Sequence, residues 1–451
     1  MSVPTLVIGA AHSGAGKTTV TLALIAALRR RGLKVQPFKV GPDYLDPSLL
    51  SWAAGRPCRN LDGWLLPPRH LLQLFHRACC GADLALVEGV MGLFDGKTGT
   101  PFEEDGSSTA AVAKLLGAPV LLVLDAQRAS RTVGAVGLGM AQADPALRVA
   151  GVVLNRVASE GHRIACLEGL GQAGLPCLGH LGRATELGLP ERYLGLVSAA
   201  ETAPGPSLRH ALAKAGTGLD LGSITAAARP AALPPPGPSL FPEHPLPTRA
   251  RIAVAMDRAF HFYYRDSLDL LEAWGAELVP FSPLESPDLP PATGGVLLGG
   301  GYPELFAAEL AANRPLRRAL RRAARRGTLV YAECGGAMYA SAGIEDAEGR
   351  RHRMLGLWPV WVTMRRPGLT VGYRRIRGHR PSFLANLELP GHEFHRSRLR
   401  GRTTNPAWAV LDQDGRPEGH AVGRVVASYI HLHLGARLGL AETFVDACAP
   451  R

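Results

Sequence analysis

Largely apolar runs alternate with helical stretches along the first half of the chain. These runs are rich in leucine and valine at consecutive positions, which is typical of strands buried on both faces. They cover residues 6–8, 34–40, 82–90, 120–125 and 149–156. Separated by helices, such strands predict an α/β fold with a doubly wound, mainly parallel sheet. In such sheets, ligands bind at the carboxyl ends of the strands.

A second α/β segment follows a change in composition. Residues 226–250 are rich in proline and alanine, with few periodic apolar positions, which indicates an extended linker between domains. Apolar strands are predicted again at residues 251–256, 295–298 and 327–332. We therefore expect a first domain over residues 1–225 and a second over residues 251–451, both of the α/β class.

A glycine-rich turn, from Gly9 to Thr19, joins the first apolar run to the first predicted helix. Strand, turn and helix form the context of a phosphate-binding (P-loop) segment, whose backbone N–H groups and helix N-terminus bind an anion. Ala11 stands where the usual spacing has glycine, but Gly-Lys-Thr at this junction still favours a nucleotide over a plain tight turn. The predicted nucleotide-binding residues are Gly14, Gly16, Lys17, Thr18 and Thr19.

Four carboxylates follow predicted strands in the same segment. Asp43 and Asp46 lie in the turn after residues 34–40. Glu88 ends the next run, and Asp95 follows it closely. Any one of them alone fits a turn residue or a helix cap, since aspartate is common there. Because Mg²⁺ is held by one or two carboxylates together with phosphate oxygens, the group beside a phosphate loop predicts an ATP site with Mg²⁺.

The second domain contains a cysteine at a sharp strand-to-helix turn. The strand at residues 327–332 leads to Cys334, and two glycines follow it. This arrangement is similar to a nucleophile elbow with sulfur in place of oxygen. An inert buried cysteine is the alternative for Cys334 taken alone. Gly300 and Gly301, after the strand at residues 295–298, are candidates to present N–H groups as an oxyanion hole.

Two histidines near the C-terminal end complete this chemistry. His431 and His433 alternate on one predicted strand, which would put both on the same face. We expect His431 to act as the base for Cys334 and His433 to orient His431. A core histidine is the alternative for His431 alone, but the presence of Cys334 favours catalysis.

The balance of charge narrows the choice of partners. The chain of 451 residues carries a formal net charge of +12. Arginines recur at helical spacing over residues 314–326 and predict a solvated helix face, without the interleaved aromatic residues of nucleic-acid modules. We therefore expect no nucleic-acid partner, and an acidic small-molecule substrate fits the charge.

Cysteine usage and hydropathy bear on the compartment. The seven cysteines are scattered and form no Cys-x-x-Cys pair, which favours a reducing compartment over a disulfide framework. The sequence shows neither a signal-peptide pattern nor an apolar run long enough to span a membrane. A cytoplasmic protein without a membrane partner is expected, and a homodimer is left open.

Several long motifs, in order, resemble the cobyrinate a,c-diamide synthase family along almost the whole chain. The matching stretches are residues 38–47, 87–96, 259–264, 391–395 and 429–433, with the turn at Cys334. The resemblance implies a dethiobiotin-synthetase-like ATPase domain joined to a class I glutamine amidotransferase domain. ATP would convert a carboxylate to an acyl phosphate, and ammonia released from L-glutamine at Cys334 would form the amide. The substrate implied is a corrinoid polycarboxylate, cobyrinate, amidated on its a and c acetate side chains in cobalamin biosynthesis.

The resemblance also implies roles for individual residues. Asp43, Tyr44, Glu88 and Asp95 match family positions tied to Mg-ATP and the tetrapyrrole carboxylates. The expected metal-binding residues are Thr18, Asp46 and Glu88, and the expected substrate-binding residues are Asp43, Tyr44, Leu45, Asp95, Gly300 and Gly301. His431 matches the base of the amidotransferase pair. Amidotransferases elsewhere often have His-x-Glu, whereas His433 stands at the third position here.

Three alternatives remain open from the sequence. The same chemistry on hydrogenobyrinate or another sirohydrochlorin-type macrocycle changes only the ring. A regulatory ATPase, with the phosphate loop as a switch, needs no thiol nucleophile, so Cys334 with His431 argues against it. A free-standing dethiobiotin-like ligase leaves the second half of the chain unexplained.

Overall fold

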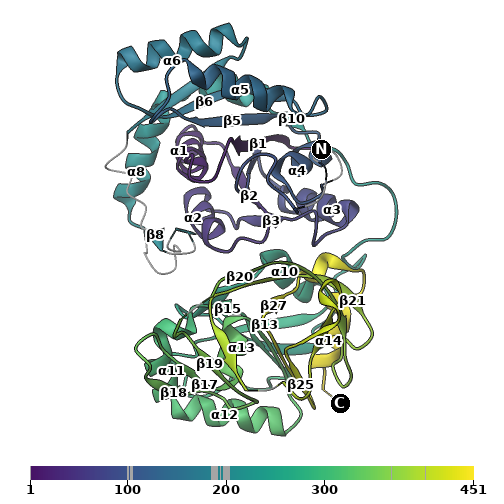
Figure 1. Cartoon of the computed structure of the whole chain (residues 1–451). Coiled ribbons are helices and arrows are strands. Elements are labelled where there is room, and N and C mark those ends of the chain that lie inside the picture. The colour runs from purple at the N-terminus through teal and green to yellow at the C-terminus, as the bar shows by residue number, and fades with distance from the viewer. Residues whose placement is uncertain are drawn as a thin grey trace. The chain divides into compact units, whose positions relative to one another are not determined.

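The computed structural model describes residues 2–98, 101, 105–183, 191–192, 195–196, 204–366, 368–401 and 403–450. The chain divides into two compact units, Met1–Gly237 and Pro238–Arg451 (Figure 1). Each unit has a mainly parallel sheet and a core of its own, in which buried apolar strands pack against helices. The α/β fold expected for both halves of the chain is confirmed.

The first unit is built on a parallel sheet with the strand order β3-β2-β4-β1-β5-β6-β7. Its strands are β1 (Pro4–Ala10), β2 (Val35–Val40), β3 (Arg59–Leu61), β4 (Leu84–Glu88), β5 (Val120–Asp125), β6 (Val149–Val157) and β7 (Cys177–Gly182). All five strands expected here are present. A short strand, β10 (Arg229–Pro230), pairs antiparallel with β1 and places Pro230 opposite Pro4.

Helices cover this sheet and fix the segment that follows β1. They are α1 (Lys17–Arg30), α2 (Leu45–Ala54), α3 (Pro68–Ala78), α4 (Thr109–Leu116), α5 (Thr132–Gln142), α6 (Glu160–Gln172), α8 (Pro206–Ala215) and α9 (Leu221–Ala227), and two further strands, β8 (Glu191–Arg192) and β9 (Gly195–Leu196), pair with each other. Helix α1 is apolar and buried over most of its length, and it packs in one core with strand β1 and helices α2 and α8. The turn between β1 and α1 is therefore held at both ends by buried elements.

The second unit has a sheet with the order β13-β11-β14-β16-β26-β25, parallel except for β25. Its strands are β11 (Ala250–Ala255), β13 (Ala276–Phe281), β14 (Gly295–Leu298), β16 (Leu329–Glu333), β25 (His420–Val422) and β26 (Val425–Ser428). An antiparallel sheet contains β24 (Arg416–Glu418), β23 (Trp408–Val410), β20 (Thr370–Gly378), β21 (Glu388–His395) and β27 (Ile430–His431). Smaller sheets contain β12 (Phe260–Phe262) with β15 (Gly300–Gly301), and β18 (Arg351–Arg353), β17 (Ser341–Glu345), β19 (Trp358–Thr363) and β22 (Arg398–Arg400).

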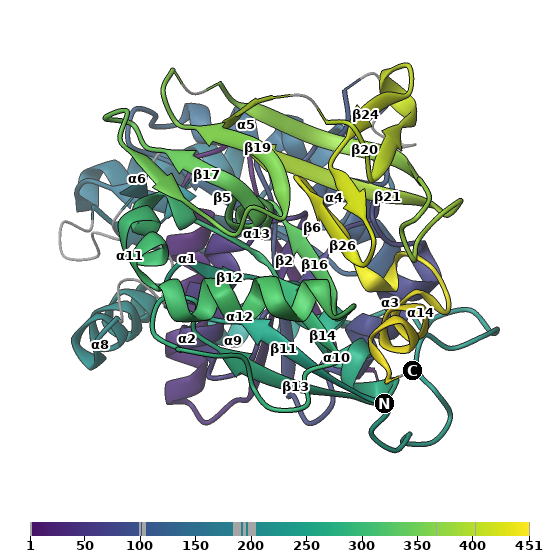
Figure 2. The ribbon, with the colours of Figure 1, turned by 90° about the horizontal axis from the view of Figure 1, so that it is seen from below.

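The helices of the second unit are α10 (Arg265–Ala273), α11 (Ala307–Ala312), α12 (Arg314–Arg325), α13 (Gly335–Ala340) and α14 (Leu440–Cys448). Helix α12 lies over one face of the parallel sheet and contributes Leu316 and Leu320 to the core (Figure 2). The expected solvated arginine face is present at Arg314, Arg318, Arg322, Arg325 and Arg326, and Arg317 is the exception. Arg317 is buried, and both Arg317 and Arg321 donate hydrogen bonds to the backbone carbonyl of Met354. A buried carbonyl without a donor would cost free energy, and these two arginines supply the donors.

The proline-rich stretch differs at its start from the expected linker over residues 226–250. Helix α9 continues to Ala227, and strand β10 follows at Arg229–Pro230. Alanine favours the helix, and the Arg229 guanidinium donates to the carbonyl of Ala226 at its end. The division between the units falls within this stretch, after Gly237. Among the described helices, none is long and apolar enough to cross a membrane.

Candidate functional site

The phosphate loop of the first unit lies at the carboxyl end of β1. Gly14 and Gly16 have φ angles of 78° and 93°, which a residue with a side chain adopts only with strain. A Cβ at Gly16 would lie 2.0 Å from Nδ2 of Asn155. That amide donates to the carbonyl of Ala15 at 2.9 Å, so β6 supports the loop from the side. The predicted loop therefore has the strand, glycine conformation and helix that its sequence implied.

A buried lysine lies at the centre of the expected carboxylates. Nζ of Lys39 is 2.7 Å from Oε1 of Glu88 and 2.6 Å from Oδ2 of Asp46. Burial alone would lower the pKa of Lys39, but Asp46 and Glu88 raise it well above its usual value. The cation thus offsets the repulsion between carboxylates that come from different strand ends. Sequence reasoning missed Lys39, because only acidic residues were considered as members of this cluster.

The hydroxyl of Thr18 completes the cluster from the start of α1. Oγ1 of Thr18 donates to Oε1 of Glu88 at 2.8 Å, so two of the three expected metal-binding residues are in direct contact. Oε2 of Glu88 is buried and has no hydrogen-bond partner. Within the described part of the chain, no group of three or more His, Cys, Asp or Glu side chains has the arrangement of a metal site. A free carboxylate oxygen beside a threonine hydroxyl fits Mg²⁺, which takes one or two protein carboxylates and otherwise binds phosphate and water.

Lys17 points toward the same region from the loop. Its Nζ donates to the carbonyl of Met91, and burial, followed by the charge of Lys39, lowers the pKa of Lys17 to about 8. Met91 itself has a φ of 47° and an exposed side chain. The turn after β4 therefore lies beside the phosphate loop, as expected for parallel strands that are neighbours in the sheet.

The expected substrate-binding residues of the first unit lie at two turns. Asp43 accepts the backbone N–H of Leu45 at 2.8 Å, which makes it a local cap for α2, and burial and Asp46 raise its pKa. Tyr44 directly precedes α2, and Leu45, its first residue, is buried. Asp95 accepts the N–H of Gly92 at 2.7 Å. Asp43 thus stabilises the turn before α2, and its Oδ2 also lies 3.8 Å from Nζ of Lys39 at the centre of the carboxylate cluster.

In the second unit, Cys334 occupies a strained turn between β16 and α13. Its φ of 48° and ψ of −102° are unusual for a residue with a side chain. The two glycines that follow are required by space: a Cβ at Gly336 would lie 2.0 Å from the carbonyl of Leu298, and one at Gly335 would lie 2.8 Å from the backbone nitrogen of Gly301. The elbow inferred from the sequence is present.

His431 lies next to Cys334 and ends strand β27. Its ring is buried and hydrogen-bonds with the Cys334 side chain. Burial alone would lower the pKa of His431, but the contacts with Cys334 and Glu333 raise it to about 10. The contacts with Cys334 and Glu333 therefore favour the protonated ring of His431 at neutral pH.

His433 does not share a strand face with His431, and that expectation is wrong. Strand β27 ends at His431, and His433 precedes a 3₁₀ turn at Leu434–Ala436. Nδ1 of His433 accepts the N–H of Gly435 at 3.0 Å, and the ring packs against Tyr264 with centroids 4.9 Å apart. Burial lowers the pKa of His433 to about 3, so the ring is neutral and belongs to the turn.

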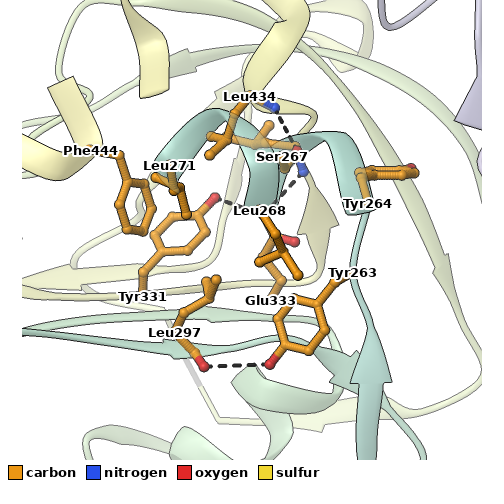
Figure 3. A pocket seen from close by; sticks show the side chains of 11 residues that line it. Tyr263, Tyr264, Ser267, Leu268, Leu271, Leu297, Tyr331, Glu333, Leu434 and Phe444 are labelled. Atoms are coloured by element: carbon orange, nitrogen blue, oxygen red, sulfur yellow. Dashed lines mark hydrogen bonds between the residues drawn. The ribbon is translucent and has the colours of Figure 1, made fainter. Parts of the chain in front are cut away.

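A carboxylate takes the place expected for His433. Oε2 of Glu333 lies 3.5 Å from Nδ1 of His431. Sequence reasoning missed Glu333, although its position directly before Cys334 at a strand end was a usable signal. Glu333 also lines a mainly apolar pocket (Figure 3). The other residues around this pocket are Tyr263, Tyr264, Ser267, Leu268, Leu271, Leu297, Tyr331, Leu432, Leu434 and Phe444.

Gly300 and Gly301 form the short strand β15 beside the cysteine. They pair antiparallel with Phe262 and Phe260. A Cβ at Gly300 would lie 2.8 Å from Cε1 of His431, so the absence of a side chain lets the His431 ring approach the backbone here. With Gly301 close to Gly335, both expected glycines border the Cys334 turn.

Comparison with known proteins assigns a class to each unit. Residues 6–196 match the CobQ/CobB/MinD/ParA nucleotide binding domain, and residues 251–438 match the CobB/CobQ-like glutamine amidotransferase domain. The chain thus joins a nucleotide-binding domain to a glutamine amidotransferase domain.

Curated relatives cover both domains together. The cobyrinate a,c-diamide synthase of Dehalococcoides mccartyi strain CBDB1 is 42% identical over 99% of this chain and 98% of its own length. That of Syntrophotalea carbinolica is 44% identical over 99% of both chains. The hydrogenobyrinate a,c-diamide synthase of Streptomyces coelicolor is 40% identical over 99% of this chain and 98% of its own. The chain belongs to the cobyrinate a,c-diamide synthase family.

Proposed function

We propose that this chain is a glutamine-hydrolysing ligase that amidates the a and c acetate carboxylates of cobyrinate with ATP as the energy source, in cobalamin biosynthesis. The contact between Cys334 and His431, in a chain that also carries a phosphate loop, supports this proposal most strongly. Family membership over the full length supports the same activity.

Glutamine hydrolysis follows from the cysteine and its histidine. The Cys334 sulfur attacks the side-chain carboxamide carbon of L-glutamine, and the His431 imidazolium gives its proton to the departing nitrogen. Ammonia leaves, and a glutamyl thioester remains on Cys334. Water then adds with His431 as base, and glutamate departs as the thiolate is restored. Backbone N–H groups at Gly300 and Gly301 are proposed to stabilise the oxyanion.

The first unit is proposed to hold ATP and Mg²⁺ and to bind the corrinoid. Gly14, Gly16, Lys17 and Thr19 would surround the phosphates, and Thr18, Asp46 and Glu88 would hold the metal. When bound, Mg-ATP would supply the phosphoryl group that turns a substrate carboxylate into an acyl phosphate with release of ADP, and ammonia would then displace inorganic phosphate to form the amide. Asp43, Tyr44, Leu45 and Asp95 are proposed to orient the substrate at the same strand ends.

The decisive experiment is the amidation of cobyrinic acid with glutamine and Mg-ATP, followed by mass spectrometry. Two successive replacements of hydroxyl by amide are expected. The Cys334→Ala variant should lose the glutamine-dependent reaction and keep the reaction with added ammonia, because only the thioester step needs the sulfur. ATP hydrolysis without amidation of any macrocycle would contradict the proposal and favour a regulatory ATPase.

A second substrate is favoured by one relative, which acts by name on hydrogenobyrinate. The same assay with the cobalt-free ring distinguishes the two, since product with that ring alone would identify hydrogenobyrinate as the substrate. The use of ATP and glutamine favours the cytoplasm as the place of reaction. A homodimer stays a prediction, which sedimentation of the purified chain tests.

A further inference from the structure

Glu333 ends strand β16 directly before Cys334, and its two carboxylate oxygens have different neighbours. Oε1 accepts a hydrogen bond from the Tyr331 hydroxyl at 3.0 Å and another from the backbone N–H of Leu432 at 3.1 Å. Oε2 lies 3.5 Å from Nδ1 of His431. Two donors therefore fix one oxygen, and the other faces the imidazole.

We propose that Glu333 is the positioning carboxylate of the glutaminase site, which holds Nδ1 of His431 so that the other ring nitrogen serves the sulfur of Cys334. This inference rests on the glutaminase half of the proposed function. The 3.5 Å separation is long for a hydrogen bond, but such contacts in a free enzyme shorten when substrate binds.

The bond from Leu432 to Oε1 adds a second constraint on His431. Leu432 follows His431 directly, so the same carboxylate holds both the ring and the backbone of the histidine segment. Strands β16 and β27 belong to different sheets, and Glu333 connects them at the point where the reaction takes place. Loss of the charge would therefore release the ring, not merely change its protonation.

The strained turn at Cys334 explains how neighbours in sequence serve one histidine. In an extended strand, adjacent side chains point to opposite faces. The φ of 48° at Cys334 breaks that alternation, so that both Glu333 and Cys334 interact with His431. The elbow thus presents an anion and a nucleophile to the two sides of a single ring.

Titratable side chains face His431 from the elements packed around it. Cys334 and Glu333 come from the end of β16 and the turn, and His392 lies opposite His431 on strand β21. Burial, followed by the charge of His431, lowers the pKa of His392 to about 3, so His392 stays neutral. Glu333 is thus the carboxylate that compensates an imidazolium at this position.

The test compares glutamate release by the full-length protein and its Glu333→Gln, Glu333→Asp and His433→Gln variants. Glu333→Gln should lower kcat by about 10²-fold or more with little change in the KM for glutamine. A misplaced base slows the chemical steps of glutamine hydrolysis and leaves the binding of glutamine unchanged. Glu333→Asp should recover part of the rate. Glu277→Gln is the matched control, since Glu277 is a partly exposed strand glutamate paired with Arg251.

A spectroscopic readout separates positioning from folding. The ring of His431, followed by NMR of labelled histidine, should titrate at lower pH in Glu333→Gln than in the unsubstituted protein, because an anion has been removed. Amidation with added ammonia should persist in that variant and report an intact fold.

The outcomes distinguish this inference from the proposed function. Glutaminase activity in Glu333→Gln within about threefold of the unsubstituted protein, or a larger loss in His433→Gln, would overturn the role of Glu333. No glutaminase activity in the unsubstituted protein would instead contradict the proposed function itself.

Discussion

At the scale of single residues, Glu88 has the most demanding surroundings in the first unit. Its side chain is fully buried, with one oxygen shared by Thr18 and Lys39 and the other without a partner. Burial, partly offset by Lys39, raises the pKa of Glu88. Burying a carboxylate oxygen without a partner raises the free energy of the folded protein unless a ligand binds it, and for this reason we propose a metal there.

Replacing Glu88 with glutamine tests that proposal. Glu88→Gln should reduce the ATP-dependent reaction by about 10²-fold or more, with glutaminase activity unchanged, because phosphoryl transfer depends on the metal that this carboxylate is proposed to hold. The measurement is ADP release against Mg²⁺ concentration, with chelation by EDTA as the metal-free limit. Glu160→Gln, on the exposed surface of α6, serves as the control. An unchanged Mg²⁺ dependence in Glu88→Gln would contradict the metal role.

Gly300 offers a residue-scale test in the second unit. A methyl group there would lie 2.8 Å from Cε1 of His431 and 3.0 Å from Cβ of Phe262. Gly300→Ala should therefore displace the imidazole and lower glutamine hydrolysis by about 10²-fold or more, since catalysis tolerates little misplacement. Ammonia-dependent amidation should survive.

The control for this substitution is Gly171→Ala. Gly171 lies in helix α6 with no atom within 4 Å of the added methyl group, so this variant should keep full activity. Equal glutaminase rates in Gly300→Ala and Gly171→Ala would show that glutamine hydrolysis does not need the close approach of His431 to β15.

At the scale of secondary-structure elements, Glu418 joins strands β24 and β26. It is buried and accepts hydrogen bonds from the Ser428 hydroxyl at 2.6 Å and from the N–H of Tyr429 at 2.9 Å. Burial raises its pKa to about 7 despite these bonds. The folded protein therefore favours the protonated carboxyl, and the stability it provides is lost as pH rises from 4.5, the usual value, through about 7.

Glu418→Gln removes that dependence and keeps the bond from the Tyr429 N–H, while the bond with Ser428 reverses, so that the amide donates to the hydroxyl. The variant should be more stable than the unsubstituted protein at about pH 8, by on the order of 1–3 kcal/mol, and the difference should shrink toward about pH 5. Denaturant unfolding at both pH values measures it. A difference independent of pH would show that Glu418 does not titrate as described.

The elements also show what the sequence could and could not predict. The strands and the phosphate loop follow from local apolar runs and glycine positions, so they were predictable. The end of β27 at His431 depends on where pairing with β21 stops, and this partner is set by the tertiary fold. The prediction that His433 shares a strand face with His431 was therefore wrong. Contacts such as Glu333 with Leu432 join residues far apart in sequence and leave no local pattern.

At the scale of the whole molecule, the net charge of +12 bears on the proposed polycarboxylate substrate. Electrostatic attraction should raise the rate of encounter with the corrinoid and not with glutamine, whose net charge is zero. The kcat/KM for cobyrinic acid should fall between about 20 and 300 mM NaCl, while that for glutamine hydrolysis changes little. Equal salt dependence of both reactions would contradict a role for charge in capturing the corrinoid.

The pairing of β10 with β1 has a consequence for protein engineering. Because Pro230 lies opposite Pro4, segments near both ends of the first unit lie side by side on its sheet. A short peptide is therefore enough to join these two ends, and new termini can be opened elsewhere in the unit. Circular permutants of the nucleotide-binding unit are thus accessible, and they would allow a reporter protein to be attached far from the natural junction with the amidotransferase.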